Sequence, residues 1–126
     1  MALEFKSTKI KPDDFFGILF NIRNQAHLLH LSTKSFSQHK ALNEFYDELL
    51  ELTDGLIESY QGKAGILSIT IPSTVYKDPV IMIKELVKMT DGGAVYNSFK
   101  ETWVLNQLDE ISSLCYETLY KLENLK

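Results

Sequence analysis

The sequence predicts an all-α fold, a four-helix bundle with three long helices and a shortened third helix. Apolar residues recur at intervals of three and four along most of the chain, which is typical of amphipathic helices. Prolines and small polar residues mark the expected helix starts. With 126 residues, 44% of them hydrophobic, the chain has the profile of one globular domain spanning 1–126.

The first helix is expected at about 12–31. Pro12 suits a first helical turn, and the acids Asp13 and Asp14 complement the helix dipole there. The predicted buried stripe consists of Phe15, Leu19, Ile22, Ala26 and Leu29. Residues 1–11 precede this start, and we predict that they form a flexible N-terminal tail.

The second helix is expected at about 36–61, with Ser35 or Ser37 as its cap. Its predicted buried stripe consists of Leu42, Phe45, Leu49, Leu52 and Leu56. A row of acids at helical spacing lies roughly opposite and consists of Glu44, Asp47, Glu51, Asp54 and Glu58. Such a row repels itself unless water, cations or a partner compensate its charge.

Alternating apolar residues from Ile66 onward predict an extended connection of about ten residues, long enough to run from one end of a bundle to the other. Asp78 and Pro79 then start a short helix at about 79–90, which ends before two glycines. A last long helix is expected at about 95–124. Cys115 falls on its apolar stripe, so we interpret it as a core residue and not as a nucleophile.

Composition excludes several classes of function. The formal net charge of −4 makes nucleic acid an unlikely main partner, although Lys6, Lys9 and Lys11 form a short basic cluster. No apolar run approaches the roughly 20 residues needed to span a bilayer. A single cysteine fits a reducing compartment. We therefore expect a soluble, cytoplasmic protein that does not bind membranes.

The stretch 27–58 concentrates the groups able to bind a metal. All three histidines, His27, His30 and His39, precede the acidic row, and Asp54 and Glu58 are one helical turn apart. Imidazole and carboxylate together suit iron, manganese or zinc. His39 and Asp54 would be about 22 Å apart along one helix at 1.5 Å per residue. One chain therefore cannot join them on one ion, whereas two antiparallel copies could, which predicts a two-fold homodimer.

At these residues the sequence resembles the Dps family, the small ferritin-like proteins that bind and oxidise iron between two subunits. His27, His39, Asp54 and Glu58 reproduce the intervals of twelve, fifteen and four residues of the family's ligand pattern. The resemblance covers about 20–62. It implies a ferritin-like bundle with an inter-subunit metal site, formed by these four residues. The segment Tyr60-Gln61-Gly62 is also similar to short ferritin-like proteins of tailed bacteriophages.

The sequence also departs from the Dps pattern. Leu28 stands where these proteins usually have tryptophan, and Asn43 replaces an acid. No Glu-x-x-His motif occurs, which argues against a di-iron centre within one chain. His30, Asp47 and Glu51 are either additional metal ligands or ordinary boundary and surface residues.

Two classes of function remain. The first is a ferritin-like, Dps-like iron-binding protein, a homodimer or a larger homo-oligomer, with Fe(II) oxidation at an inter-subunit site. It would be at most a ferroxidase-like enzyme. The second is a non-enzymatic helical interaction or structural protein that keeps the fold without a working metal site.

Overall fold

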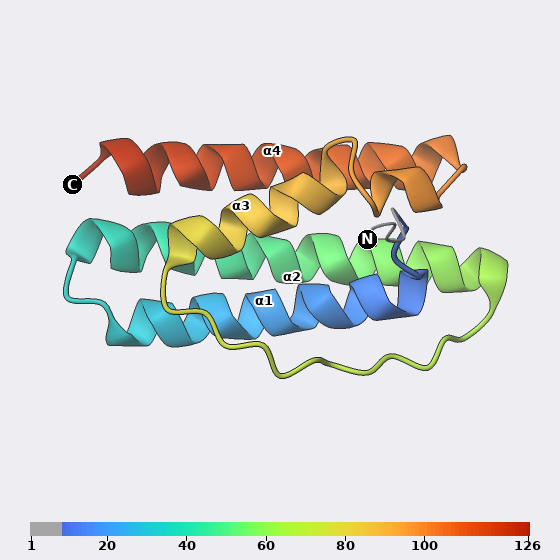
Figure 1. Ribbon diagram of the computed structural model, residues 1–126, viewed down its shortest axis with the longest axis horizontal. Helices are drawn as coiled ribbons and strands as arrows, with labels where there is room; N and C mark the ends of the chain where they lie inside the picture. Colours follow the sequence, from blue (N-terminus) through green and yellow to red (C-terminus); the bar gives the residue numbers. More distant parts are fainter. Residues whose placement is uncertain (1–8) are drawn as a thin grey trace, which may run out of the picture.

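The computed structural model describes residues 9–126 and consists of helices joined by irregular segments (Figure 1). The α-helices are α1 (Pro12–Ser32), α2 (Phe36–Ala64), α3 (Pro79–Thr90) and α4 (Thr102–Asn124), and a 3-10 turn, η2, spans Tyr96–Ser98. Residues 9–126 contain no strand. The predicted all-α bundle of three long helices and a short third one is confirmed. Lys6 and most of the predicted N-terminal tail lie outside the described residues.

The helices form an elongated bundle in which α1 and α2 make an antiparallel hairpin (Figure 1). The connection 65–78 returns along α1 from one end of the bundle to the other, as the sequence predicted. Helix α4 packs on α2 and on α3, which crosses the bundle obliquely. The turn between α1 and α2 and the end of α4 therefore lie at the same end of the molecule.

The two predicted caps are formed. Ser35 Oγ accepts the backbone N–H of Gln38 at 3.2 Å, which satisfies one of the free amides at the start of α2. Asp78 caps α3 in the same way, through Val80 N–H at 2.9 Å. Helix α2 ends three residues later than predicted, at Ala64, before Gly65 with φ of 91°.

The connection 65–78 is held on α1 by side chains that bond to its backbone. Asn21 Nδ2 donates to Thr74 O at 3.0 Å, and Gln25 Oε1 accepts Tyr76 N–H at 3.2 Å. At Gly17 the backbone approaches so closely that an added Cβ would lie 2.0 Å from Thr70 O. Glycine is therefore required at this point of α1.

The predicted start of the last helix at residue 95 is wrong, because α4 begins at Thr102. Ser98 accounts for part of the difference. Its hydroxyl donates to Ala94 O at 2.7 Å and accepts Ile10 N–H at 3.1 Å, so the chain makes a short turn instead of a helix. Val95 and Phe99 on either side are buried, which explains why the apolar spacing still looked helical.

One apolar core runs through the bundle, and its largest fully buried side chains include Phe15, Phe16, Phe45, Leu49, Met82 and Leu108. Cys115 is buried in this core, and burial raises the pKa of its thiol to about 12. Its interpretation as a packing residue is confirmed, since a reactive cysteine needs an accessible thiolate. None of the helices within residues 9–126 is both long and apolar enough to cross a bilayer.

Candidate functional site

The three histidines gather at the turn between α1 and α2. The rings of His30 and His39 stack with centroids 3.7 Å apart and planes inclined by 19°. The ring of His27, one turn before His30 on α1, lies 6.1 Å from that of His30. His30 is buried, whereas His27 and His39 are partly exposed. His30 is therefore a neighbour of both predicted ligands, His27 and His39. From the sequence, His30 was either an additional ligand or a boundary residue.

His30 and His39 exchange hydrogen bonds across the turn. His30 Nδ1 lies 2.6 Å from His39 O, and His39 Nδ1 lies 2.8 Å from His30 O. A carbonyl oxygen only accepts hydrogen bonds, so both Nδ1 atoms must be the donors. In each neutral ring the lone pair is then on Nε2, the arrangement that a second-shell carbonyl gives to a metal-binding histidine.

Tyr46 of α2 and Arg23 of α1 continue this cluster along the hairpin. The Tyr46 ring stacks on His27 at 4.3 Å between centroids and meets His30 edge-on at 5.4 Å. The Arg23 guanidinium lies 5.0 Å from the centre of the same ring. The Tyr46 hydroxyl donates to Asn43 Oδ1 at 2.8 Å. We call Arg23, His27, His30, His39 and Tyr46 the histidine cluster.

The acidic half of the predicted site has a different environment. Asp54 and Glu58 are exposed on α2, and so are Asp47 and Glu51. Among the described residues none of these four carboxylates has an ion-pair or hydrogen-bond partner. In contrast, Glu44 on the same helix pairs with Lys121 Nζ of α4 at 2.7 Å.

The Glu44 ion pair shows what a compensating cation does on this helix. Its hydrogen bond with Lys121 lowers the pKa of the Glu44 carboxyl group and raises the pKa of the Lys121 ammonium group. Asp47, Glu51, Asp54 and Glu58 form no such ion pair with the described residues. They remain available to a cation or to a partner.

One chain does not bring the two halves of the predicted site together. His39 is fifteen residues before Asp54 on the continuous helix α2, a rise of about 22 Å. Within residues 9–126, no three side chains of the types His, Cys, Asp and Glu converge on a common metal position. Any site that uses the four predicted ligands must therefore join two chains.

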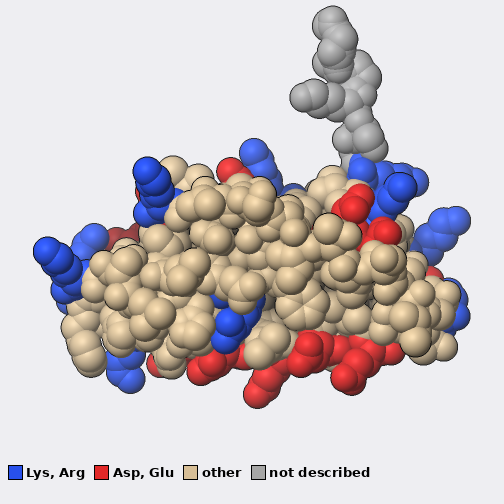
Figure 2. Space-filling view, turned by 90° about the horizontal axis from the view of Figure 1, so that it is seen from below, with Lys and Arg blue, Asp and Glu red and all other residues tan. Residues whose placement is uncertain are grey.

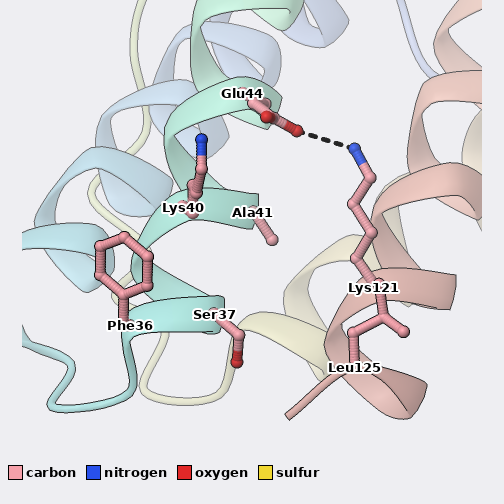
Figure 3. Close-up of a pocket in the computed structure, with 7 residues that line it drawn as sticks. All are labelled: Phe36, Ser37, Lys40, Ala41, Glu44, Lys121 and Leu125. Atoms are coloured by element: carbon pink, nitrogen blue, oxygen red, sulfur yellow. Dashed lines mark hydrogen bonds and ion pairs between the residues drawn. The ribbon is translucent and has the colours of Figure 1, made fainter.

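A shallow groove adjoins the histidine cluster at the same end of the bundle (Figure 3). It measures about 350 Å³ and lies between the start of α2 and the end of α4, where it is lined by Phe36, Ser37, Lys40, Ala41, Glu44, Lys121 and Leu125. Phe36 is 75% exposed, and its ring also stacks near His39 with centroids 6.4 Å apart. The groove is mostly apolar, with the ion pair of Glu44 and Lys121 spanning it.

Figure 2 views the side of the molecule formed by α1 and the connection 65–78, and few charged side chains interrupt it. Arg23 is the only Lys, Arg, Asp or Glu of α1 after Asp14, and residues 64–76 contain none. Carboxylates gather along one long edge of this view. The large apolar side chains exposed on these two segments are Leu28, Leu31, Ile66, Ile71 and Val75.

Arg23 and Tyr46 are not among the residues that the sequence predicted for the site. Neither residue type is typical of a metal site, and both lie near the apolar stripes of their helices, so the pattern alone assigned them no role. One signal was present. Arg23 is the single formal charge on the seventeen residues from Phe15 to Leu31, and a charge in such a segment usually has a specific partner.

Comparison with known proteins agrees with a phage relationship. An uncharacterised 14.6 kDa protein from the mobD–ri intergenic region of Enterobacteria phage T4 is 28% identical over 115 residues, which cover 89% of this chain and 88% of the phage protein. No solved structure matches the chain significantly. The model of a family of unknown function, DUF5856, matches residues 30–122, a range that includes His39, Asp54 and Glu58. The chain therefore belongs to the DUF5856 family.

Proposed function

We propose that this protein is a ferritin-like, Dps-like iron-binding protein whose sites form between two antiparallel copies. His27 and His39 of one chain and Asp54 and Glu58 of the other would hold each ion. The observation that supports this proposal is the separation of the ligand set into two incomplete halves. One half is an ordered histidine cluster, and the other is a pair of exposed carboxylates that have no partner within residues 9–126.

Each half fits Fe(II). The hydrogen bond from His39 Nδ1 to His30 O leaves Nε2 as the coordinating atom and fixes the ring. Asp54 and Glu58, at positions i and i+4, face the same side of α2 and can both reach one ion. Mixed imidazole and carboxylate ligands suit Fe(II), and Mn(II) and Zn(II) would compete for the same donors.

A two-fold dimer would contain two such sites. In this proposal Fe(II) is the substrate, and each ion gives up one electron. Two ions thus supply the two electrons that reduce one hydrogen peroxide, with two protons, to two water molecules, while both irons become Fe(III). The protein contributes the ligands and their geometry, and the metal carries the redox step.

Anaerobic Fe(II) titration followed by native mass spectrometry tests the proposal. We expect the dimer to gain two irons, and His39→Ala and Glu58→Ala each to weaken Fe(II) binding by roughly 100-fold while the fold is kept. Asp109→Ala removes an exposed carboxylate from α4 and serves as the matched control, with unchanged binding. Equal Fe(II) binding by wild type and His39→Ala would overturn the assignment.

The alternative is a non-enzymatic interaction or structural protein. The apolar groove beside Phe36 and the nearly uncharged surface of α1 and residues 65–78 favour it, since exposed apolar patches commonly mark protein contacts. Under this alternative, wild type takes up no Fe(II), Mn(II) or Zn(II). Substitution of Phe36 by serine would then weaken association with its partner, while His39→Ala would leave that association unchanged.

A further inference from the structure

We infer that Arg23 anchors the contact between two copies of this chain, by pairing with Asp47 and Glu51 of the second copy. This inference rests on the proposed shared site and extends it, because it identifies the surface and the register through which the copies meet. It starts from a cation that has no anionic partner, and from carboxylates that have no cationic one, in the part of the chain that the structure describes.

The Arg23 side chain is only partly satisfied within its own chain. Its guanidinium lies over the Tyr46 ring, and Nη1 donates to Asn24 Oδ1 at 3.1 Å. Its Nε is buried and has no hydrogen-bond partner. A guanidinium has five N–H donors and cannot lose its charge in a protein, so a half-buried one needs acceptors.

No carboxylate of the same chain supplies these acceptors among the described residues. The ion pairs there join Lys63 to Glu101, Lys84 to Glu123 and Lys121 to Glu44. Arg23 of α1 lies against the ring of Tyr46 of α2, so it is placed where the two helices meet. A partner that covers this part of the hairpin would bury Arg23 further and would have to bring an acid to it.

The register of the proposed metal site brings such acids. An antiparallel contact that sets His39 level with the midpoint of Asp54 and Glu58 also sets Tyr46 level with about position 49 of the second α2. Asp47 and Glu51 lie on either side of that position, one turn apart, on the exposed side of the helix. One alignment of the two helices would thus bring the metal ligands together and also place Arg23 beside Asp47 and Glu51 of the second copy.

A second copy of this chain can supply acids to Arg23 and a cation to Asp47 and Glu51 in the same contact. In a two-fold contact each chain offers Arg23 and receives the acids of the other, so the pairing occurs twice. A guanidinium suits two neighbouring carboxylates because its donors point in fixed directions. The same contact relieves the repulsion between Asp47 and Glu51 within each helix.

Sedimentation velocity of the metal-free protein, with a chelator present, tests this contact apart from iron binding. We expect a wild-type dimer, and at least a roughly 100-fold weaker dimer in Arg23→Glu, since reversal places like charges face to face. Combining Arg23→Glu with Asp47→Lys and Glu51→Lys should restore the dimer. Lys88→Glu, an exposed reversal on α3, is the matched control and should leave it unchanged.

Arg23→Gln keeps a donor for Asn24, and it should weaken the dimer by about ten-fold, so the inference is testable even if Arg23→Glu fails to fold. A dimer of wild-type strength in Arg23→Gln, or no recovery in a folded triple variant, would overturn the Arg23 contact. If the Arg23 contact is overturned but Fe(II) uptake is intact, the proposed shared metal site is not contradicted. An Arg23-dependent dimer that does not bind Fe(II) would instead overturn the proposed function alone. A wild-type protein that is monomeric without metal would overturn the Arg23 contact, and one that also takes up no Fe(II) would overturn both.

Discussion

The two halves of the candidate site meet on helix α2, which carries His39, Asp54 and Glu58, yet they differ in burial and in bonding. The histidine cluster is packed, stacked and hydrogen-bonded across the turn between α1 and α2. Asp54 and Glu58 are exposed and without partners among the described residues. Residues that hold a fold together are expected to have partners within the chain. Groups that bind a ligand or a second chain need none, and under the proposed function the acidic half belongs to this second kind.

The two halves should differ most in how much they contribute to the free energy of unfolding. His30→Ala removes a buried ring, its stacking on His39 and a hydrogen bond, and it leaves His39 O without its partner. We expect it to lower the free energy of unfolding by about 2–3 kcal/mol. Urea unfolding followed by circular dichroism measures this. A change below about 0.5 kcal/mol would show that the cluster is not structural.

A smaller effect should separate the Tyr46 ring from its hydroxyl group. Tyr46→Phe keeps the stacking on His27 but loses the hydrogen bond to Asn43, so we expect a cost of about 1 kcal/mol. The same unfolding measurement detects it. Asn43→Ala removes the other partner of that bond and should cost a similar amount, and non-additive costs in the double variant would confirm the link.

Replacing the acidic half should leave stability almost unchanged. Asp54→Asn combined with Glu58→Gln removes two exposed charges from a self-repelling row, so we expect the free energy of unfolding to rise by no more than about 0.5 kcal/mol. Fe(II) binding by the same variant should be lost, as measured by anaerobic dialysis. Stability loss comparable to that of His30→Ala would mean that these acids have partners within the fold.

The smallest effect concerns Glu44, the compensated acid of α2. Its pairing with Lys121 lowers the pKa of the carboxyl group below its value in the unfolded chain. The stabilisation is therefore present above the unfolded-state pKa and is lost as the pH falls through the folded-state pKa. For so exposed a pair we expect only a few tenths of a kcal/mol. Comparing Glu44→Gln with wild type at pH 7 and pH 3 should show a larger difference in unfolding free energy at pH 7 than at pH 3.

Much of the fold followed from the sequence because its signals were local. Apolar spacing, Ser35 and the pair Asp78-Pro79 placed three of the four helices within three residues of their observed ends. The start of α4 could not be predicted, since Ser98 makes its turn with Ile10, which is distant in sequence. Periodicity records which side of a helix is buried, and it does not record contacts of this kind.

The candidate site was predicted in part for the same reason. Sequence spacing located the histidines and the acids, and the rise of one helix was enough to separate Asp54 from His39. It could not show that His30 and His39 exchange hydrogen bonds, because this depends on how the α1–α2 turn closes. The position of Arg23 over Tyr46 likewise depends on the packing of two helices.

Mixing two inactive variants tests the central claim of a shared site most directly. One variant carries His27→Ala and His39→Ala, and the other carries Asp54→Ala and Glu58→Ala. If the ligands come from two chains, neither variant binds Fe(II) alone, but their mixed dimer contains one intact site. Random exchange of subunits should then restore about a quarter of the wild-type Fe(II) capacity. No recovery in a mixture shown by native mass spectrometry to contain mixed dimers would contradict the account.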